Sequence, residues 1–505
     1  METTLDTLLE DTDYALGGAS SERARAENRV LLEELERKKR ARSLAVPTDD
    51  NKVKARLREI GEPITLFGER APDRRDRLKY VLSQIQAARG GDMVVDEESD
   101  ESDSEEEEEF YTPGTSELLE ARRRIAEFSI PRAHKRIAKQ REESKLPLSR
   151  IIDLRKRVYA DLKAYAILGS QIADDRAISQ VRFSPNSKIL ASGSWSGNVK
   201  LWDIPSCNLS TQLRGHTDRV GGIAWHPQST IGLEESVVNL ATGAADAKVH
   251  LWSLNSDKPL ATLKGHRERV ARVAFHPSGD YVASASFDGT WRLWDIQTST
   301  ELLVQEGHSK EVFAVQFQDD GALVASGGLD AIGRVWDLRT GRTAMVLDGH
   351  VKEIFGIDFS PNGYQIATGS GDDSIRIWDM RSLRALHTIP AHLSTVSDVK
   401  FFRRAATSAA PSGDVSMDSP SEKQNGAEPA HPAEDDHLTS GLYLASSGYD
   451  GQVKIWSADD WQLVRSLSTD AGKVMSVDIS SDGRFVVSGS WNRSYQLFAN
   501  ENIAL

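Results

Sequence analysis

The sequence GHRERVARVAFHPSGDYVASASFDGTWRLWD, residues 265–295, decides the fold of this chain. It holds three short β-rich runs of alternating character, at residues 270–275, 281–286 and 290–294. The proline, glycine and aspartate residues between these runs favour tight turns. Because one further strand fits before the pattern starts again, the stretch predicts an antiparallel sheet of about four strands.

The same pattern recurs along the C-terminal two-thirds of the chain. The aromatic residues that close successive copies are Trp202, Trp252, Trp294, Trp336, Trp378, Trp456 and Phe498. Most steps between them are 42 residues long, which indicates one supersecondary unit repeated seven times. Two steps are longer, and we expect the surplus residues near 228–236 and at 405–440 to lie in loops, because the period continues on both sides.

Five copies carry further polar residues at fixed spacing. A histidine opens the copy, an aspartate lies six residues before the closing tryptophan, and a hydroxyl lies four residues before the aspartate. We expect one hydrogen-bond chain per copy, running from aspartate through histidine and hydroxyl to the indole, because buried polar groups are costly unless paired. The predicted chains are His216, Thr242, Asp246 and Trp252; His266, Ser284, Asp288 and Trp294; His308, Ser326, Asp330 and Trp336; His350, Thr368, Asp372 and Trp378; and His392, Ser446, Asp450 and Trp456.

With these motifs, residues 171–500 resemble the WD-repeat β-propellers. The resemblance implies an all-β, seven-bladed WD-repeat propeller, and an α-helical, partly disordered N-terminal arm precedes it. The chain ends too soon after Phe498 to supply an outer strand for the last blade. We therefore expect residues 164–174 to provide this strand, so that the two ends of the repeat region close the ring and remove two open sheet edges.

Composition limits the possible settings of the protein. The single cysteine, Cys207, excludes an intramolecular disulfide and favours a reducing compartment. No apolar run approaches the roughly 20 residues of a membrane span, and the acidic start is no secretory signal, so cytosol or nucleus is expected. The net charge of −14 conceals an acidic run at residues 96–109 and a basic stretch at 122–163. The acidic run is either a solvated spacer or a kinase substrate. The basic stretch either binds phosphate groups or is the solvent-exposed face of a helix.

We predict five regions from these patterns. Apolar residues at helical spacing, with capping and proline signals, indicate short helices between residues 46 and 90. The regions are a charged helical arm at 1–45, a helical module at 46–90, an acidic disordered linker at 91–115, a basic helical segment at 116–165, and the propeller at 166–505 with a disordered insertion at 405–440.

The helical module carries a second resemblance. Residues 46–50, 61–69 and 74–78 are similar to the splicing-factor motif of pre-mRNA processing factors, and together with a propeller they resemble the WD-repeat members of the U4/U6 small nuclear ribonucleoprotein. That resemblance implies a nuclear scaffold in pre-mRNA splicing that persists into the U4/U6·U5 tri-snRNP. It implies binding to pre-mRNA processing factor three, to U4/U6 snRNA mainly through its backbone, and to other tri-snRNP proteins, with a cyclophilin as a further candidate partner.

Catalysis and metal binding are not expected. A nucleophilic Ser-His-Asp triad occurs once beside an open cleft, whereas this set recurs in five copies and ends on a tryptophan that must be buried. No CxxC, HExxH or aspartate-rich loop has ligand spacing, so we predict no catalytic residue, no metal site and no cofactor. An enzyme would need one cluster of polar side chains that occurs once, in the central channel. The sequence shows only polar sets that recur from repeat to repeat.

Binding surfaces are the better candidates. Aromatic residues just before the turn aspartate are expected at one rim of the propeller, where they either anchor a protein interface or are covered by neighbouring loops. The predicted partner-binding residues are Ile64, Leu66, Phe67, Trp195, Phe287, Tyr449 and Trp491. The residues predicted to meet RNA or an acidic partner are Arg132, Lys135, Arg136, Arg155, Lys156, Arg157, Arg219 and Arg269. The competing interpretation is an adaptor propeller that recruits substrates to a nuclear chromatin or ubiquitin complex, although no F-box-like docking helix is evident.

Overall fold

The structure, a computed structural model, describes residues 50–64, 70–88, 114–404 and 436–500. The predicted charged arm at 1–45 lies outside the described residues, as do nearly all of the acidic linker and most of the 405–440 insertion. The chain divides into two compact units, a helical unit and a larger unit with the strands, and each is described by itself. None of the helices in the described ranges combines the length and the apolar character needed to cross a membrane.

The helical unit is a pair of helices, α3 (Asp50–Glu59) and α4 (Ala71–Ala88). Gly61 follows α3 with a φ of 83°, a conformation that glycine adopts without steric cost. Val53 and Leu57 of α3 pack with Leu78 of α4, and all three are fully buried. The predicted apolar sides of the two helices therefore face one another and form a small core.

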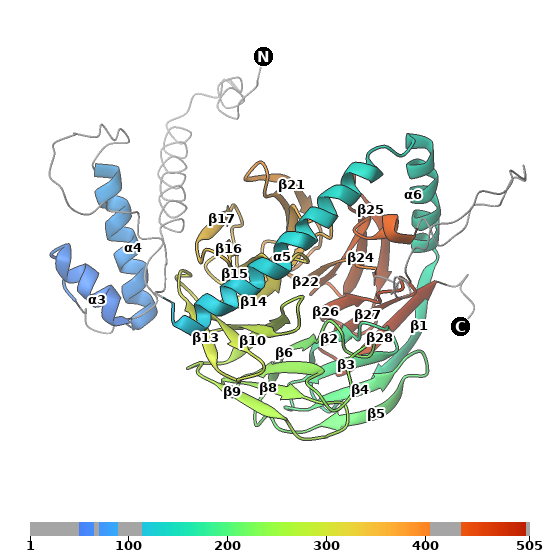
Figure 1. The fold of residues 1–505 in the computed structure, drawn as a ribbon, viewed down its shortest axis with the longest axis horizontal. Coiled ribbons are helices and arrows are strands. Elements are labelled where there is room, and N and C mark those ends of the chain that lie inside the picture. The colour runs from blue at the N-terminus through green and yellow to red at the C-terminus, as the bar shows by residue number, and fades with distance from the viewer. Residues whose placement is uncertain (1–49, 65–69, 89–113, 405–435, 501–505) are drawn as a thin grey trace, which may run out of the picture. The chain divides into compact units, whose positions relative to one another are not determined.

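Seven four-stranded antiparallel sheets make up the propeller (Figure 1). The inner strands are β2 (Ile178–Phe183), β6 (Val220–Trp225), β10 (Val270–Phe275), β14 (Val312–Phe317), β18 (Ile354–Phe359), β22 (Val396–Phe401) and β26 (Val474–Ile479). The second strands are β3 (Ile189–Ser194), β7 (Leu240–Ala244), β11 (Tyr281–Ser286), β15 (Leu323–Gly328), β19 (Gln365–Ser370), β23 (Tyr443–Gly448) and β27 (Phe485–Ser490).

The remaining strands complete the blades toward the outside. The third strands are β4 (Val199–Asp203), β8 (Lys248–Trp252), β12 (Trp291–Asp295), β16 (Ile332–Asp337), β20 (Ser374–Asp379), β24 (Gln452–Ser457) and β28 (Ser494–Asn500). The outer strands are β5 (Asn208–Leu213), β9 (Ala261–Lys264), β13 (Glu301–Gln305), β17 (Thr343–Asp348), β21 (Arg384–Pro390), β25 (Leu463–Ser468) and β1 (Tyr165–Ile172). The expected fold class, with seven blades, is confirmed.

The ring closes as the sequence predicts. Strand β1 pairs antiparallel with β28, from Tyr165 opposite Asn500 to Ile172 opposite Ser494. The last blade is therefore built from β26, β27, β28 and β1. Both ends of the repeat region contribute to one sheet, in which β28 is paired on both sides and β1 is the outer strand, as in the other blades.

Each closing tryptophan packs between two blades. Trp294 of blade three is 1% exposed and lies among apolar side chains of blade two, including Val249 and Leu251. Across the closure, Trp202 of blade one packs with Val487 and other residues of blade seven. These blade-to-blade contacts supply most of the apolar burial, because each sheet is too small to form a core alone.

The longer steps in the repeat fall in loops. The surplus near residues 228–236 lies between β6 and β7, and the larger insertion lies between β22 and β23. One part of the predicted disordered insertion is wrong, because residues 436–439 form the short 3₁₀ helix η1 (Asp436–Thr439).

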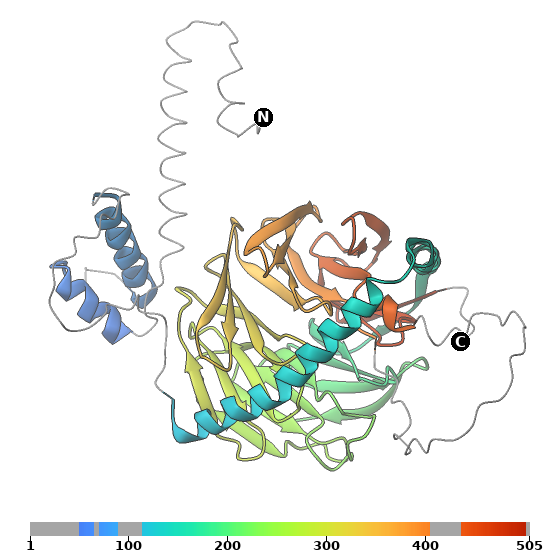
Figure 2. The ribbon, with the colours of Figure 1, turned by 45° about the horizontal axis from the view of Figure 1, so that its top comes forward.

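The predicted basic segment consists of two helices, α5 (Ser116–Glu143) and α6 (Leu148–Lys163), which run along one side of the propeller (Figure 2). Leu118, Ala121 and Ile125 of α5 are buried in a cluster with residues of blades three and four. Leu162 of α6 is buried in a cluster with residues of blades six and seven. These helices are therefore part of the propeller unit.

Candidate protein-docking site

The predicted hydrogen-bond chain is present in all five blades. Histidine Nδ1 lies 2.9–3.2 Å from the nearest aspartate oxygen, and Nε2 lies 2.6–2.8 Å from the hydroxyl. The indole Nε1–H donates to the same hydroxyl at 2.7–2.9 Å. The histidine side chains are at most 1% exposed, so these groups hold the blade and do not face a substrate.

Electrostatics in these chains follows from burial and pairing. Burial alone would raise the pKa of Asp288, but hydrogen bonds from His266 and Thr290 outweigh it and hold the pKa below its usual range. Burial lowers the pKa of His266, although the Asp288 carboxylate opposes this shift. In blade three, a neutral His266 imidazole beside an ionised Asp288 carboxylate is therefore favoured at neutral pH.

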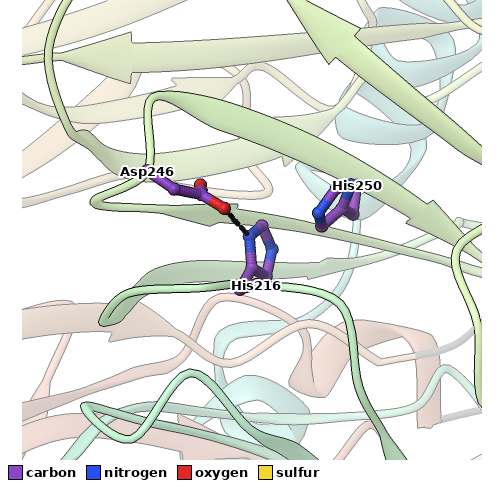
Figure 3. Close-up of side chains that lie close together, drawn as sticks. All are labelled: His216, Asp246 and His250. Atoms are coloured by element: carbon purple, nitrogen blue, oxygen red, sulfur yellow. Dashed lines mark hydrogen bonds and ion pairs between the residues drawn. The ribbon is translucent and has the colours of Figure 1, made fainter.

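Blade two contains a second histidine beside this chain (Figure 3). The rings of His216 and His250 lie 4.2 Å apart, and one ligand atom from each lies within 4.8 Å of an Asp246 oxygen. Hydrogen bonds with Asp246, Thr242 and Thr262 already engage three of the four ring nitrogens. A metal ion would have to replace the His216–Asp246 bond that the other four blades also make, so we assign this cluster a structural role.

The predicted rim aromatics line one cavity at the mouth of the central channel. We call it the rim cavity. It measures about 200 Å³, and its lining includes the predicted Trp195, Phe287, Tyr449 and Trp491. Each of these residues follows a second strand, and its backbone N–H donates to a carbonyl just before the inner strand, as from Phe287 to Arg269 at 3.0 Å. This repeated bond places one side chain of each blade at the same level of the rim.

Two of the rim aromatics meet across the closure of the ring. Trp195 and Trp491 contact edge to face with ring centroids 4.7 Å apart. Trp491 remains 46% exposed and Trp195 is partly exposed, so loops do not cover them. An exposed, rigid aromatic cluster of this kind is typical of the anchors of protein interfaces.

Sequence reasoning missed two aromatic residues of the rim cavity, Phe313 and Phe355. Both occupy the second position of an inner strand, where the pairing of Val312 and Ala314, and likewise of Ile354 and Gly356, shifts register. Such a bulge re-aims one side chain away from the alternating pattern. The signal was a large aromatic at a position where the other inner strands have serine, glycine, alanine or methionine.

Arginines stand over the aromatic rings of the rim cavity. The guanidinium of Arg219 lies 4.8 Å from the ring centre of Trp195, and that of Arg269 lies 3.5 Å from the ring centre of Phe287. Arg272, which was not predicted, lies 5.0 Å from the ring centre of Phe313. The two predicted arginines thus belong to the same site as the predicted aromatics.

Two residues of α5 and α6 that were predicted to bind RNA, Arg136 and Arg155, instead contact the propeller. Arg136 pairs with Asp320 at 2.8 Å and donates to the Asn362 carbonyl at 3.0 Å, while Arg155 pairs with Asp459 at 2.9 Å. The expectation of free phosphate-binding groups is therefore corrected for these two, because propeller carboxylates already engage them. Among the other predicted residues, Arg132 donates to the Asp319 carbonyl, and Lys135, Lys156 and Arg157 are exposed.

Of the predicted residues in the arm, only Ile64 is described. It is partly exposed, and its carbonyl accepts a hydrogen bond of 3.5 Å from Arg77. Leu66 and Phe67 lie outside the described residues.

Comparisons with known proteins agree with this architecture. A family described as "WD domain, G-beta repeat" matches residues 167–203, 207–253, 257–295, 299–337, 341–379, 436–457 and 461–498, which together make up more than half of the chain. The chain belongs to the WD-repeat family. Within its helical pair, residues 53–81 match a second family, described as "pre-mRNA processing factor 4 (PRP4) like". The resemblance of the sequence to WD-repeat pre-mRNA processing factors is thus confirmed.

Curated relatives carry related names. The chain is 45% identical over 209 residues to "U4/U6 small nuclear ribonucleoprotein Prp4" of Homo sapiens, which covers 40% of the chain and 39% of that protein. It is 40% identical over 225 residues to "U4/U6 small nuclear ribonucleoprotein PRP4-like protein" of Arabidopsis thaliana, covering 43% of the chain and 41% of the relative. It is 34% identical over 194 residues to "U4/U6 small nuclear ribonucleoprotein PRP4" of Saccharomyces cerevisiae, covering 36% and 40%. The chain thus spans about two-fifths of the length of these relatives.

The first and last WD repeats depart from the shared hydrogen-bond chain. In blade one, Trp202 donates to Ser192 at 2.9 Å, while Lys200 pairs with Asp174 at 3.1 Å. In blade seven, Phe498 stands in place of the tryptophan, and the Ser488 Oγ has no hydrogen-bond partner among the described residues. Blade one therefore replaces the histidine and aspartate of the chain with the Lys200–Asp174 pair, whereas blade seven lacks the chain.

The central channel of this WD-repeat propeller corrects one expectation. It contains a single, non-repeated polar cluster around a cavity of about 190 Å³, where only repeated groups were expected. Arg182 pairs with Asp398 at 2.9 Å, and Asp358 pairs with Arg403 at 2.8 Å and with Lys400 at 3.7 Å. These groups come from inner strands β2, β18 and β22 and from the residues after β22, and their mutual pairing stabilises the channel wall.

Proposed function

We propose that the chain is a non-catalytic scaffold subunit of the U4/U6 and U4/U6·U5 small nuclear ribonucleoproteins, acting in pre-mRNA splicing in the nucleus. The observation that carries the proposal is the combination of a PRP4-like helical segment and a complete WD-repeat propeller in one chain. Relatives named as U4/U6 small nuclear ribonucleoproteins in mammals, a plant and a yeast support the same conclusion.

The two units would divide the work of binding. The helical pair binds a partner splicing factor, which the resemblance identifies as pre-mRNA processing factor three, through the segment with Ile64, Leu66 and Phe67. A pair whose buried core consists of Val53, Leu57 and Leu78 gains further burial when it docks on a partner. The propeller binds other components through the rim cavity, whose exposed aromatics are preorganised for a protein contact.

RNA contact would be made mainly to the backbone. Lys135, Lys156 and Arg157 are exposed on α5 and α6 and can meet phosphates by counterion release. Arg136 and Arg155 are engaged by the propeller and would contribute only indirectly. Binding of U4/U6 RNA through these helices should accordingly be salt-dependent and insensitive to base sequence.

Co-purification tests the proposal. The full chain, tagged and isolated from nuclear extract, should bring down U4 and U6 RNA together with other small nuclear ribonucleoprotein components. Deleting residues 46–86 should abolish binding of the partner splicing factor, whereas deleting the 405–435 insertion should leave it intact. Recovery of chromatin or ubiquitin-ligase subunits without U4 or U6 RNA would favour the adaptor interpretation instead.

A further inference from the structure

Positive charge gathers in the rim cavity, where carboxylates such as Glu311 near Arg269 and Asp398 near Arg272 act on the arginines only through space. Arg219, Arg269 and Arg272 line it, and the structure gives none of them an ion pair with a described carboxylate. Arg182 and Arg403, in contrast, form ion pairs where they reach into the channel. None of the residues that line the rim cavity is an aspartate or a glutamate.

These arginines are already positioned for an acidic ligand. Each guanidinium lies over an aromatic ring, at 4.8 Å from Trp195, 3.5 Å from Phe287 and 5.0 Å from Phe313. Stacking fixes the plane of each group. Arg272 is buried and already donates to the Gly221 carbonyl, so the N–H edges available to a ligand are those of the exposed Arg219 and Arg269. A carboxylate that enters the site would therefore find oriented donors in a partly desolvated setting, where charge-assisted hydrogen bonds are strong.

The same contacts disfavour a nucleic-acid base. Stacking of a base requires a free aromatic face, and arginines occupy faces of Trp195, Phe287 and Phe313. Further rings are engaged edge to face, as in the pairs Trp195–Trp491 and Phe313–Phe355. Positive charge in a site where Trp491 is the main exposed ring, and where arginines cover three of the other rings, fits an acidic polypeptide better than a run of stacked bases.

The volume of the rim cavity limits the size of the side chain that can enter it. The rim cavity measures about 200 Å³, somewhat more than the roughly 150 Å³ of an apolar cavity that holds benzene. One aromatic or large apolar side chain fills such a space, with its backbone extended across the channel mouth. Carboxylates on the neighbouring residues of that backbone would then lie near Arg219 and Arg269.

We propose that the rim cavity binds an acidic linear segment of a partner protein, which inserts one aromatic side chain among the rim aromatics and sets flanking carboxylates against Arg219 and Arg269. This inference rests on the proposed docking of a protein at the rim and specifies its chemistry.

Fluorescence anisotropy with the full chain tests this inference. The probes are a short labelled peptide with one phenylalanine between runs of glutamate, the matching peptide with lysine in place of glutamate, and an oligouridine RNA. The glutamate peptide should bind best, and its affinity should fall with added salt. Arg269→Glu should weaken it at least about tenfold, as expected for the loss of a charge-assisted contact. Arg384→Glu, on the exposed outer strand β21, is the matched control and should leave binding unchanged.

The possible results separate the failure of this inference from the failure of the proposed function. If the glutamate peptide does not bind, or binds the wild type and Arg269→Glu with equal affinity, the rim does not recognise acidic segments. Preferential binding of oligouridine, with the same dependence on Arg269, makes the rim an RNA site. If the peptide fails while U4 and U6 RNA still co-purify with the chain, only the ligand chemistry is wrong; if the RNA is absent and the peptide binds, the ribonucleoprotein assignment is wrong.

Discussion

Trp195 of blade one and Trp491 of blade seven meet edge to face, 4.7 Å between ring centroids, across the seam where the ring of blades closes. The two residues are far apart in the sequence, and the pairing of β1 with β28 holds their blades in register. The seam is thus both the mechanical closure of the propeller and one wall of the rim cavity. A residue of the seam can therefore contribute to binding at the rim as well as to packing between the first and last blades.

Trp491→Ala should separate binding from stability. Trp491 is 46% exposed, and an edge-to-face aromatic pair is worth only about 0.5–1.5 kcal/mol, so the thermal midpoint should fall slightly. Retention of proteins that dock at the rim should fall strongly, as for a hot-spot residue. Leu393→Ala is the control, because Leu393 is 88% exposed and outside the cavity lining. Equal retention by both variants would remove the rim cavity as the docking site.

Ser326→Ala should destabilise blade four, whereas Ser488→Ala in blade seven should not. The Ser326 Oγ bonds both His308 and Trp336, so its removal leaves two buried polar groups unpaired, at a cost of about 1–3 kcal/mol each. The Ser488 Oγ has no partner among the described residues, and its loss should be neutral or stabilising. Equilibrium denaturation of the two variants measures the difference. Equal losses would contradict a structural role for the hydrogen-bond chain.

Arg136→Ala should loosen α5 from the propeller. The change removes the ion pair with Asp320 and the bond to the Asn362 carbonyl, leaving a nearly buried carboxylate without this cation, for a loss of about 1–3 kcal/mol. Hydrogen exchange of the α5 amides should become faster. Lys135→Ala, at the exposed neighbouring position, should not change exchange in α5 but should weaken RNA retention. The opposite pattern would restore Arg136 as an RNA ligand.

Much of the fold could be predicted because the repeat carries its own constraints. The 42-residue step from Trp252 to Trp294 fixes one blade, and the hydroxyl ten residues before each tryptophan, such as Ser284, lies on the adjacent strand within reach of the indole N–H. Closure followed from counting strands, since β26, β27 and β28 supply three strands of the last blade and β1, which precedes the first inner strand, supplies the fourth. The repeat period and a count of the strands were sufficient to predict the blade and the closure of the ring.

The rest depended on contacts that no local pattern records. Phe313 reaches the rim only because a bulge interrupts the alternation of β14, and a bulge has no certain sequence signal here. Arg136 looked like a free basic group, and its partner Asp320 lies 184 residues away. The channel pairs such as Arg182 with Asp398 are likewise visible only once distant blades are brought together.

His276 should make the stability of the propeller depend on pH. It is fully buried, with Nδ1 bonded to Ser278 and Nε2 to the Gly321 carbonyl. Burial is the main cause that lowers its pKa to about 4, although the Gly321 carbonyl and Asp280 oppose it. Below pH 6.5, His276 binds a proton in the unfolded chain but stays neutral in the folded chain. Its contribution to the free energy of unfolding is therefore complete above pH 6.5 and is lost as the pH falls toward 4. The contribution reaches about 3 kcal/mol at most.

Denaturation of the wild type and of His276→Gln between pH 7 and pH 5 measures this contribution. The wild type should lose stability across this interval, because the unfolded state binds more protons than the folded state. His276→Gln, which cannot take up this proton, should start lower but show a shallower dependence on pH. His134→Gln, at an exposed position on α5, should keep the wild-type slope. If His276→Gln also keeps that slope, the acid sensitivity comes from other buried groups.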